Sequence, residues 1–137
     1  MEYQCKVIIN EKIEPVTNIF LNHDLMLKWE QGLLHYEKIK ENPLTYHLIF
    51  KSDGHEFVMK ETIKDNLLPK SVTIIYEVPG VYNECKNTFI SDGEHVEWIM
   101  DVKFEFNQKP FQSKEDFICK TQSGMLQFKN FIENQQY

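Results

Sequence analysis

The sequence contains no arginine: all 15 of its basic residues are lysines, and the formal net charge is −6. Arginine is the side chain that best pairs with phosphates and guanine edges, because its guanidinium donates two parallel hydrogen bonds. No lysine-rich stripe takes its place. The sequence therefore predicts no nucleic-acid partner.

Long hydrophobic runs are also missing. No apolar stretch reaches the ~18 residues that a membrane-spanning helix requires. The N-terminal segment MEYQCKVIIN interleaves charged and apolar side chains and has no small-residue cleavage site, unlike a signal peptide. These features predict no membrane span and a cytoplasmic location.

Cysteine and histidine are few and widely spaced. Cys5, Cys85 and Cys119 form no CxxC pair, so we expect reduced thiols. Cys85 has neither a nearby histidine in sequence nor a lysine on its strand face, which argues against a nucleophile. The five histidines show no HxH or HExxH spacing. We therefore expect no metal site and no cofactor.

The length and composition that remain indicate one globular domain spanning residues 1–137. A hydrophobic share of 42% and an aromatic share of 13% are ordinary for a folded protein. A chain of 137 residues buries enough surface to form a core without disulfide bonds.

Hydrophobic periodicity predicts one strand, two short helices, about six strands and one long terminal helix. The expected ranges are a strand at 5–10, two helices within 15–31, strands at 33–40, 45–52, 55–64, 71–78, 81–90 and 95–106, and a helix at 113–134. Short turns containing Asp53-Gly54, Pro79-Gly80 and Asp92-Gly93 make successive strands antiparallel. Asp24 is the expected cap of the second helix, Gly32 its end, and Ser113 with Asp116 resembles a capping box.

Several polar residues fall on strand faces that should point inward. Glu84 and Lys86 should face solvent, because charged residues are rarely buried. Side chains alternate along a strand, so Asn83, Cys85 and Asn87 should face the core. By the same alternation, Glu61 shares a face with Phe57, Met59 and Ile63, and Tyr76 with Val72, Ile74 and Val78. Buried polar groups without partners cost about 1–3 kcal/mol each. These groups must therefore bond to one another, to water or to a ligand.

This order of elements resembles the SRPBCC superfamily of START and Bet v 1-like helix-grip proteins. The segments that carry the resemblance are PVTNIFLN…LMLKWEQGL, Trp29…Gly32, Glu61-Thr62-Ile63, PGVYN…NTF, Glu97-Trp98 and LQFKNFIEN. The small bacterial polyketide cyclase/dehydrase-like members are the most similar. The resemblance implies an α+β fold in which about seven curved antiparallel strands surround the terminal helix. It also implies a cavity for a lipid- or polyketide-like molecule. The glycine-rich loop of the Bet v 1 plant proteins is absent, and KENPLT stands in its place.

The leading hypothesis is binding of an apolar small molecule between the sheet and the terminal helix. The candidate ligand-binding residues are Phe57, Met59, Glu61, Tyr76, Asn83, Asn87, Trp98, Met100, Gly124 and Phe128. Each of these residues also has a purely structural interpretation. The asparagines could form hydrogen bonds with an irregular strand or with buried water, and Glu61 could pair with Tyr76 or an asparagine. The apolar residues could simply belong to the core. Gly124 indicates either a close approach of helix and sheet or room for a ligand.

Two other functions remain open at this stage. A cyclase or dehydratase would use Glu61 as general base, so the sequence leaves enzymatic activity undecided. The activators of the Hsp90 ATPase share this fold family, so a protein-interaction module is the third hypothesis, resting on fold analogy alone.

Overall fold

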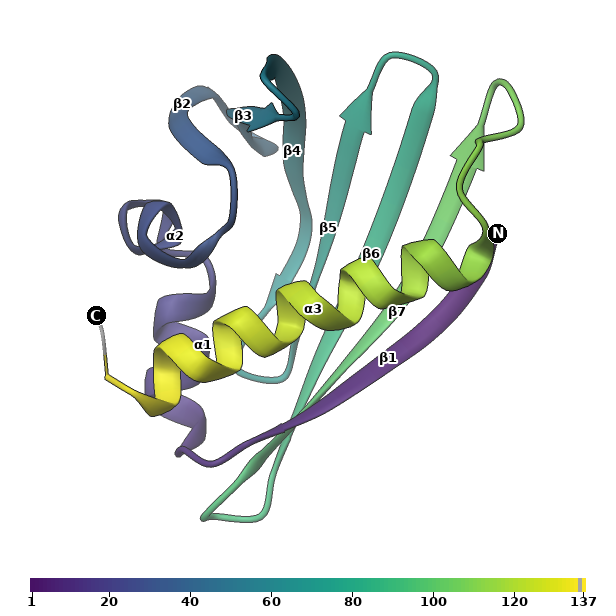
Figure 1. The fold of residues 1–137 in the computed structure, drawn as a ribbon. Coiled ribbons are helices and arrows are strands. Elements are labelled where there is room, and N and C mark those ends of the chain that lie inside the picture. Colours follow the sequence, from purple (N-terminus) through teal and green to yellow (C-terminus); the bar gives the residue numbers. More distant parts are fainter. Residues whose placement is uncertain (136) are drawn as a thin grey trace.

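The computed structural model, which describes residues 1–135 and 137, contains seven strands and three helices in the predicted order (Figure 1). The elements are β1 (Glu2–Ile9), α1 (Ile13–Phe20), α2 (His23–Trp29), β2 (Leu33–Glu41), β3 (Leu44–Ser52), β4 (His55–Leu67), β5 (Ser71–Val78), β6 (Val81–Ser91), β7 (Val96–Phe106) and α3 (Lys114–Glu133). The predicted α+β helix-grip fold is confirmed. Among the described residues, no helix has the length and hydropathy to cross a membrane.

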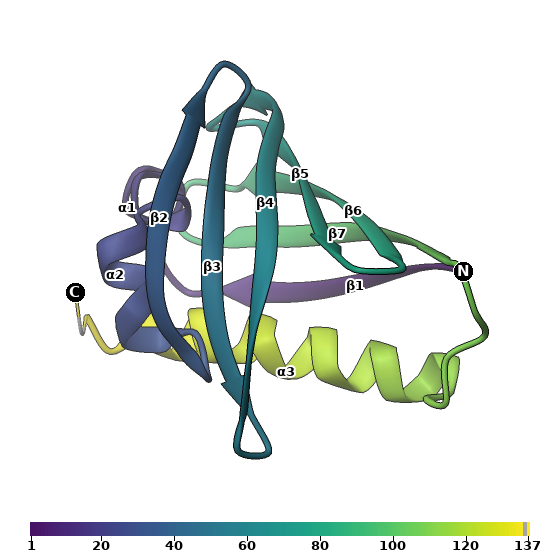
Figure 2. The same ribbon diagram turned by 90° about the horizontal axis from the view of Figure 1, so that it is seen from above.

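All seven strands form one antiparallel sheet in the order β1-β7-β6-β5-β4-β3-β2. Each strand from β2 to β7 pairs with its neighbour in sequence, whereas β1 pairs with β7 at the far edge. The sheet curves so that α3 lies across its concave side, and α1 and α2 cover one end (Figure 2).

Local capping sets the helix starts. Ser113 forms the predicted capping box with Asp116, because each side chain accepts a hydrogen bond from the other residue's backbone N–H. The prediction of Asp24 as a cap was wrong. Asn22 has the extended backbone of a cap residue, and its Oδ1 accepts from the Leu25 N–H at 3.1 Å. Asp24 lies inside the first turn, where its carboxylate instead accepts from the Tyr36 hydroxyl.

Gly32 lies in the turn between α2 and β2, three residues after the helix ends at Trp29. Its φ of +83° is in the left-handed region, and a Cβ there would come within 2.8 Å of the Lys51 carbonyl oxygen. Glycine is therefore required at this position for both backbone conformation and space.

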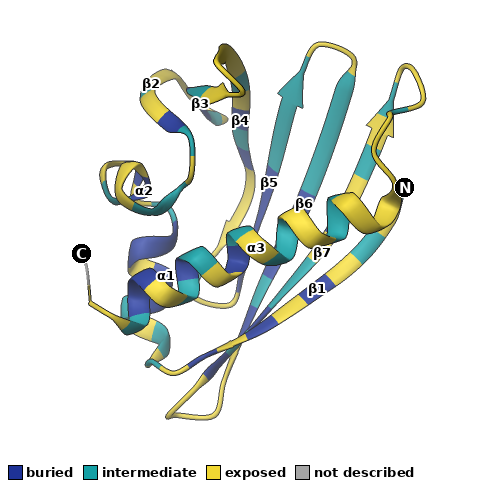
Figure 3. Ribbon diagram, viewed as in Figure 1, coloured by how far each residue is buried: buried dark blue, intermediate teal, exposed yellow. Residues whose placement is uncertain are grey.

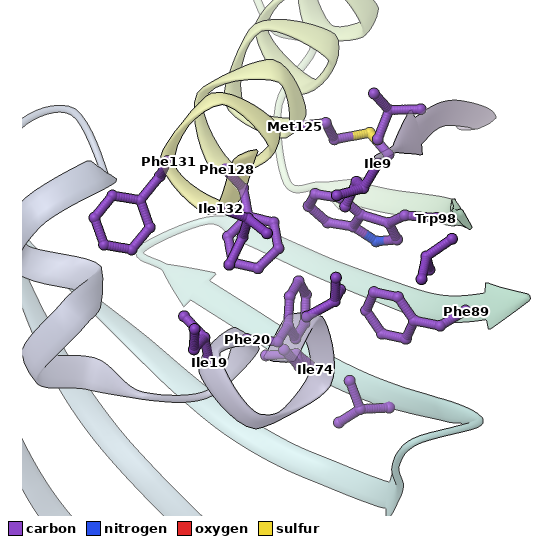
Figure 4. Close-up of a cluster of buried hydrophobic side chains, with 14 of the residues drawn as sticks. Ile9, Ile19, Phe20, Ile74, Phe89, Trp98, Met125, Phe128, Phe131 and Ile132 are labelled. Carbon is purple, nitrogen blue, oxygen red and sulfur yellow. The ribbon is translucent and has the colours of Figure 1, made fainter. Parts of the chain in front are cut away.

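The best-packed part of the core lies where α1 and the C-terminal half of α3 meet the sheet (Figure 4). The Phe20 ring makes edge-to-face contacts with Phe89, Trp98 and Phe128 at centroid distances of 5.1, 5.2 and 5.5 Å. Such pairs add about 0.5–1.5 kcal/mol each beyond the burial of their area. This cluster closes one end of the space between sheet and helix.

Candidate functional site

The concave face of the sheet is fully buried at the α1 end but only partly covered toward the other end (Figure 3). Half-buried residues on this inward face and on the facing helix are Met59, Tyr76, Val78, Val81, Asn83, Met100, Phe104, Phe106, Phe117, Ile118 and Thr121. The strand side chains among them lie on the face that α3 crosses, and all of them still contact solvent. We call this partly exposed inward face of strands β3 to β7, together with the facing side of α3, the concave cleft.

Two aromatic clusters bound the concave cleft. The core around Phe20 and Phe128 closes one end, and Phe117 of α3 meets Phe104 and Phe106 of β7 at the other, with centroid distances of 5.0 and 5.6 Å. Between them, the backbone of α3 approaches β1 and α2 closely. A Cβ built on Gly124 would meet no atom within 4 Å. Of the two explanations for Gly124, the structure favours open space over a close helix–sheet approach.

A row of polar side chains crosses the concave cleft from β3 to β6. Tyr46 pairs with Glu61, Glu61 with Tyr76, and Tyr76 with Asn83 in the strand registers. Residues directly opposite one another in an antiparallel sheet project from the same face with Cβ atoms about 4.5–5.5 Å apart. Tertiary pairing thus aligns four residues that are far apart in sequence, and three of them (Glu61, Tyr76 and Asn83) were predicted site residues.

Glu61 is the most deeply buried member of this row, with 0% exposure. Its Oε1 lies 2.6 Å from Nε2 of His23, the first residue of α2, which is itself 6% exposed. The His23 ring stacks on Tyr46 at 3.8 Å. Glu61 Oε2 has no hydrogen-bond partner. Since a buried polar atom without a hydrogen-bond partner is costly, this atom marks a position for water or a ligand donor.

Sequence reasoning missed His23 because no local pattern connects it to β4. The two residues are 38 positions apart, and α2 contacts the edge of the sheet only in the folded chain. Glu61 was expected to form a hydrogen bond with Tyr76 or an asparagine, and this expectation was wrong. A histidine contributes the hydrogen bond instead.

The end of α2 brings a second carboxyl group and an indole to the concave cleft. Burial and the nearby charge of Glu61 raise the pKa of Glu30 to about 7, and Lys120 acts in the opposite direction. Burial, then Glu61, Cys85 and Glu30, raise the pKa of Tyr76 well above its usual value. The buried Trp29 Nε1 has no acceptor. Glu61, Glu30 and Tyr76 thus lie within electrostatic range of one another, and the Trp29 indole adds an N–H without an acceptor.

Asn87 projects inward as predicted, but its amide is used by the protein itself. Its Oδ1 accepts from Trp98 Nε1 at 3.0 Å, and its Nδ2 donates to the carbonyl oxygens of Val72 and Cys85 at 3.3 and 3.4 Å. Asn83, in contrast, is half-buried, donating to the Lys103 carbonyl at 3.1 Å. The two asparagines therefore differ: Asn87 organises the core, and Asn83 borders the open part of the cleft.

The remaining predicted site residues occupy three kinds of position. Trp98 and Phe128 lie in the packed core, at 2% and 0% exposure. Met59 and Met100 are half-buried on the inward face. Phe57 is 39% exposed near the β3–β4 turn, where its ring stacks on Phe50. The structure thus separates Phe57 from the polar row.

Two depressions of about 470 and 400 Å³ lie on the convex side of the sheet, one beside Ile8, Ile90 and Glu97 and the other beside Gln4, Lys86 and Asp101. Both are shallow, and their polar side chains face solvent. Among the described residues, no group of three histidine, cysteine or acidic side chains is arranged to hold a metal ion.

Neither protein-family models nor curated proteins match the sequence. Solved structures do match the fold. The chain is similar to Ara h 8.0201, with a TM-score of 0.81, 10% identity and 98% of each chain covered. It is similar to ZhuI aromatase/cyclase from Streptomyces sp. R1128, with a TM-score of 0.79 and 9% identity over 100% of this chain and 96% of that one. It is also similar to a START superfamily protein from Mycobacterium smegmatis, with a TM-score of 0.77, 10% identity and 98% of each chain covered. The chain therefore has the helix-grip fold of the SRPBCC, or START and Bet v 1-like, superfamily.

Proposed function

We propose that this protein binds an apolar small molecule, lipid- or polyketide-like, in the concave cleft. The observation that carries the proposal is the partly exposed inward face between the two aromatic clusters, together with two buried polar atoms without partners, Glu61 Oε2 on that face and Trp29 Nε1 on α2. Ligand sites typically combine an apolar lining with a few polar groups that fix orientation. The half-buried methionine, aromatic and valine side chains supply the lining, and Glu61, Tyr76 and Asn83 supply the polar groups.

The structural neighbours are consistent with this function, since a START superfamily protein and an aromatase/cyclase share the fold. At 9–10% identity they support the architecture and not a particular ligand. The proposal therefore rests on the concave cleft of this chain.

Titration with the neutral dye Nile red tests the proposal. We expect saturable binding with increased fluorescence and displacement by dodecanol. Gly124→Phe places a ring in the open space and should weaken binding at least about tenfold, equivalent to ~1.4 kcal/mol. Leu126→Phe adds an aromatic ring at a residue of the same helix that is 42% exposed, and serves as the matched control. Equal affinity for both variants, or no saturable binding to the wild type, would refute the proposal.

The His23–Glu61 pair favours a second candidate, proton transfer from a bound carbonyl compound with Glu61 as base. A hydrogen-bonded imidazole holds one carboxylate oxygen and leaves the other free to accept a proton. Deuterium uptake at the α-carbons of a long-chain methyl ketone in D2O, followed by NMR, measures this activity. Catalysis by Glu61 predicts accelerated exchange that Glu61→Gln abolishes while Nile red binding survives. Exchange no faster than in buffer alone, or equal rates in both proteins, would exclude the candidate.

A further inference from the structure

The charges around the polar row are predominantly acidic. Glu61 and Glu30 both influence the ionisation of Tyr76, so the three groups lie within electrostatic range of one another. On β1 and on β3 to β7, no strand position that faces the concave cleft carries a lysine, and the chain has no arginine. On β2, the exposed Lys38 lies opposite Tyr46 and forms an ion pair with Glu41. Two other basic side chains lie near the row: His23, which is hydrogen bonded to Glu61, and Lys120, which is exposed on α3 and acts on Glu30. A ligand carboxylate would enter this region without a buried cation to pair with.

The hydrogen-bonding capacity of Glu61 also favours a ligand that donates hydrogen bonds. His23 occupies Oε1, and Oε2 is buried without a donor. An ammonium group presents up to three N–H donors, and a hydroxyl group presents one. Donation to Oε2 would remove the penalty of the unpaired oxygen and, for an ammonium, add a charge-assisted bond.

Aromatic rings next to the carboxylates also favour a cation. Tyr46 and Tyr76 flank Glu61 on the neighbouring strands, and both are half-buried on the same face. His23 already stacks on the Tyr46 ring, so Tyr76 is the ring available to a ligand cation. A cation within about 6 Å of an aromatic face gains about 0.5–2 kcal/mol, with the larger value for a desolvated site. Carboxylates beside the Tyr76 ring form an environment suited to an amine.

We propose that the polar end of the ligand is an ammonium group, held by Glu61 and Glu30 beside Tyr76, with its apolar chain in the concave cleft. This inference rests on the proposed binding function and specifies its ligand class. An amphiphilic amine is selected over the corresponding alcohol, and the alcohol over the corresponding carboxylate.

Three probes with the same alkyl chain test the selectivity: dodecylamine, dodecanol and dodecanoate, used below their micellar concentrations as competitors of Nile red. The measurement is made near pH 8, above the raised pKa of about 7 for Glu30. We expect the amine to bind at least about tenfold more tightly than the alcohol, a difference of ~1.4 kcal/mol. The carboxylate should be the weakest of the three.

Matched variants separate local recognition from general attraction to an acidic protein. Glu61→Gln and Glu30→Gln each preserve side-chain size and should reduce the preference for the amine over the alcohol several-fold. Glu37→Gln removes the same charge from an exposed position on β2 and should leave the preference unchanged. If Glu61→Gln fails to fold, Glu30→Gln provides the same comparison.

The outcomes distinguish this inference from the binding function. Dodecanoate binding as tightly as dodecylamine, or equal loss of preference in Glu37→Gln, would overturn the ammonium assignment while leaving an apolar site. Failure of all three probes and of Nile red to bind would overturn the binding function itself.

Discussion

Replacing Gly124 with alanine should stabilise the protein. Gly124 lies in the interior of α3, and its φ is not in the left-handed region. Glycine in a helix interior is less favourable than alanine by about 0.8–1.0 kcal/mol, because glycine loses more backbone freedom on folding. An added Cβ would meet no atom within 4 Å, so no steric cost offsets this gain. We expect the free energy of unfolding to rise by about 1 kcal/mol.

Equilibrium denaturation in urea measures the effect, with the slope m unchanged and the midpoint raised. In a thermal scan the same change should raise Tm by roughly 3–5 °C, between the values typical of smaller and larger domains. Nile red affinity should change little, because a methyl group occupies little of the cleft.

Gly32→Ala is the matched control, since it makes the same chemical change where space and backbone are restricted. The new Cβ would come within 2.8 Å of the Lys51 carbonyl oxygen at a φ of +83°. We expect a loss of about 1–3 kcal/mol. A destabilised Gly124→Ala protein would refute the reasoning, because it would mean that α3 packs directly against the sheet and leaves no open space at this position.

Three further predictions concern the core, the thiols and the pH dependence of stability. Asn87→Ala should lower the free energy of unfolding by about 2 kcal/mol, measured by urea denaturation, because the buried Trp98 N–H loses its acceptor; a change below about 0.5 kcal/mol would contradict this. A thiol reagent at neutral pH should modify Cys119 alone in the native protein, since Cys85 is buried and its pKa is raised to about 12; rapid modification of a second thiol would count against it. Glu30 has a folded-state pKa of about 7, above its usual 4.5. Its stabilising contribution to the free energy of unfolding should therefore be fully present below about pH 4.5 and be lost as the pH rises through 7. Relative to wild type, Glu30→Gln should therefore gain about 1–3 kcal/mol between pH 5 and pH 8 in urea denaturation, and parallel profiles would exclude this effect.

The order and faces of the strands could be predicted because alternation along a strand is a local property. In β7 the inward residues Val96, Trp98 and Val102 are all buried, as their spacing predicts. The capping box at Ser113 was also visible in sequence, since its two partners are three residues apart. The cap of α2 was not resolved in the same way, because Asn22 and Asp24 are both acceptable cap residues and only the backbone conformation distinguishes them.

The inward direction of several candidate residues could be predicted, whereas their role in binding a ligand stays a prediction. Alternation correctly turned Glu61, Tyr76 and Asn87 inward, since each shares a strand face with core residues. Which of them remain available to a ligand depends on their partners in space. Trp98 uses the Asn87 amide, and His23 uses one oxygen of Glu61.

The sequence by itself determined which side of each strand is apolar, where the chain turns, and that a long amphipathic helix ends the domain, because these depend on neighbours a few residues apart. Only the tertiary structure decided that Tyr46, Glu61, Tyr76 and Asn83 form one row and that His23 and Glu30 join them from α2. Strand register and helix docking are set by packing between segments distant in sequence. The charge and hydrogen-bonding state of a buried group depend on those same distant neighbours.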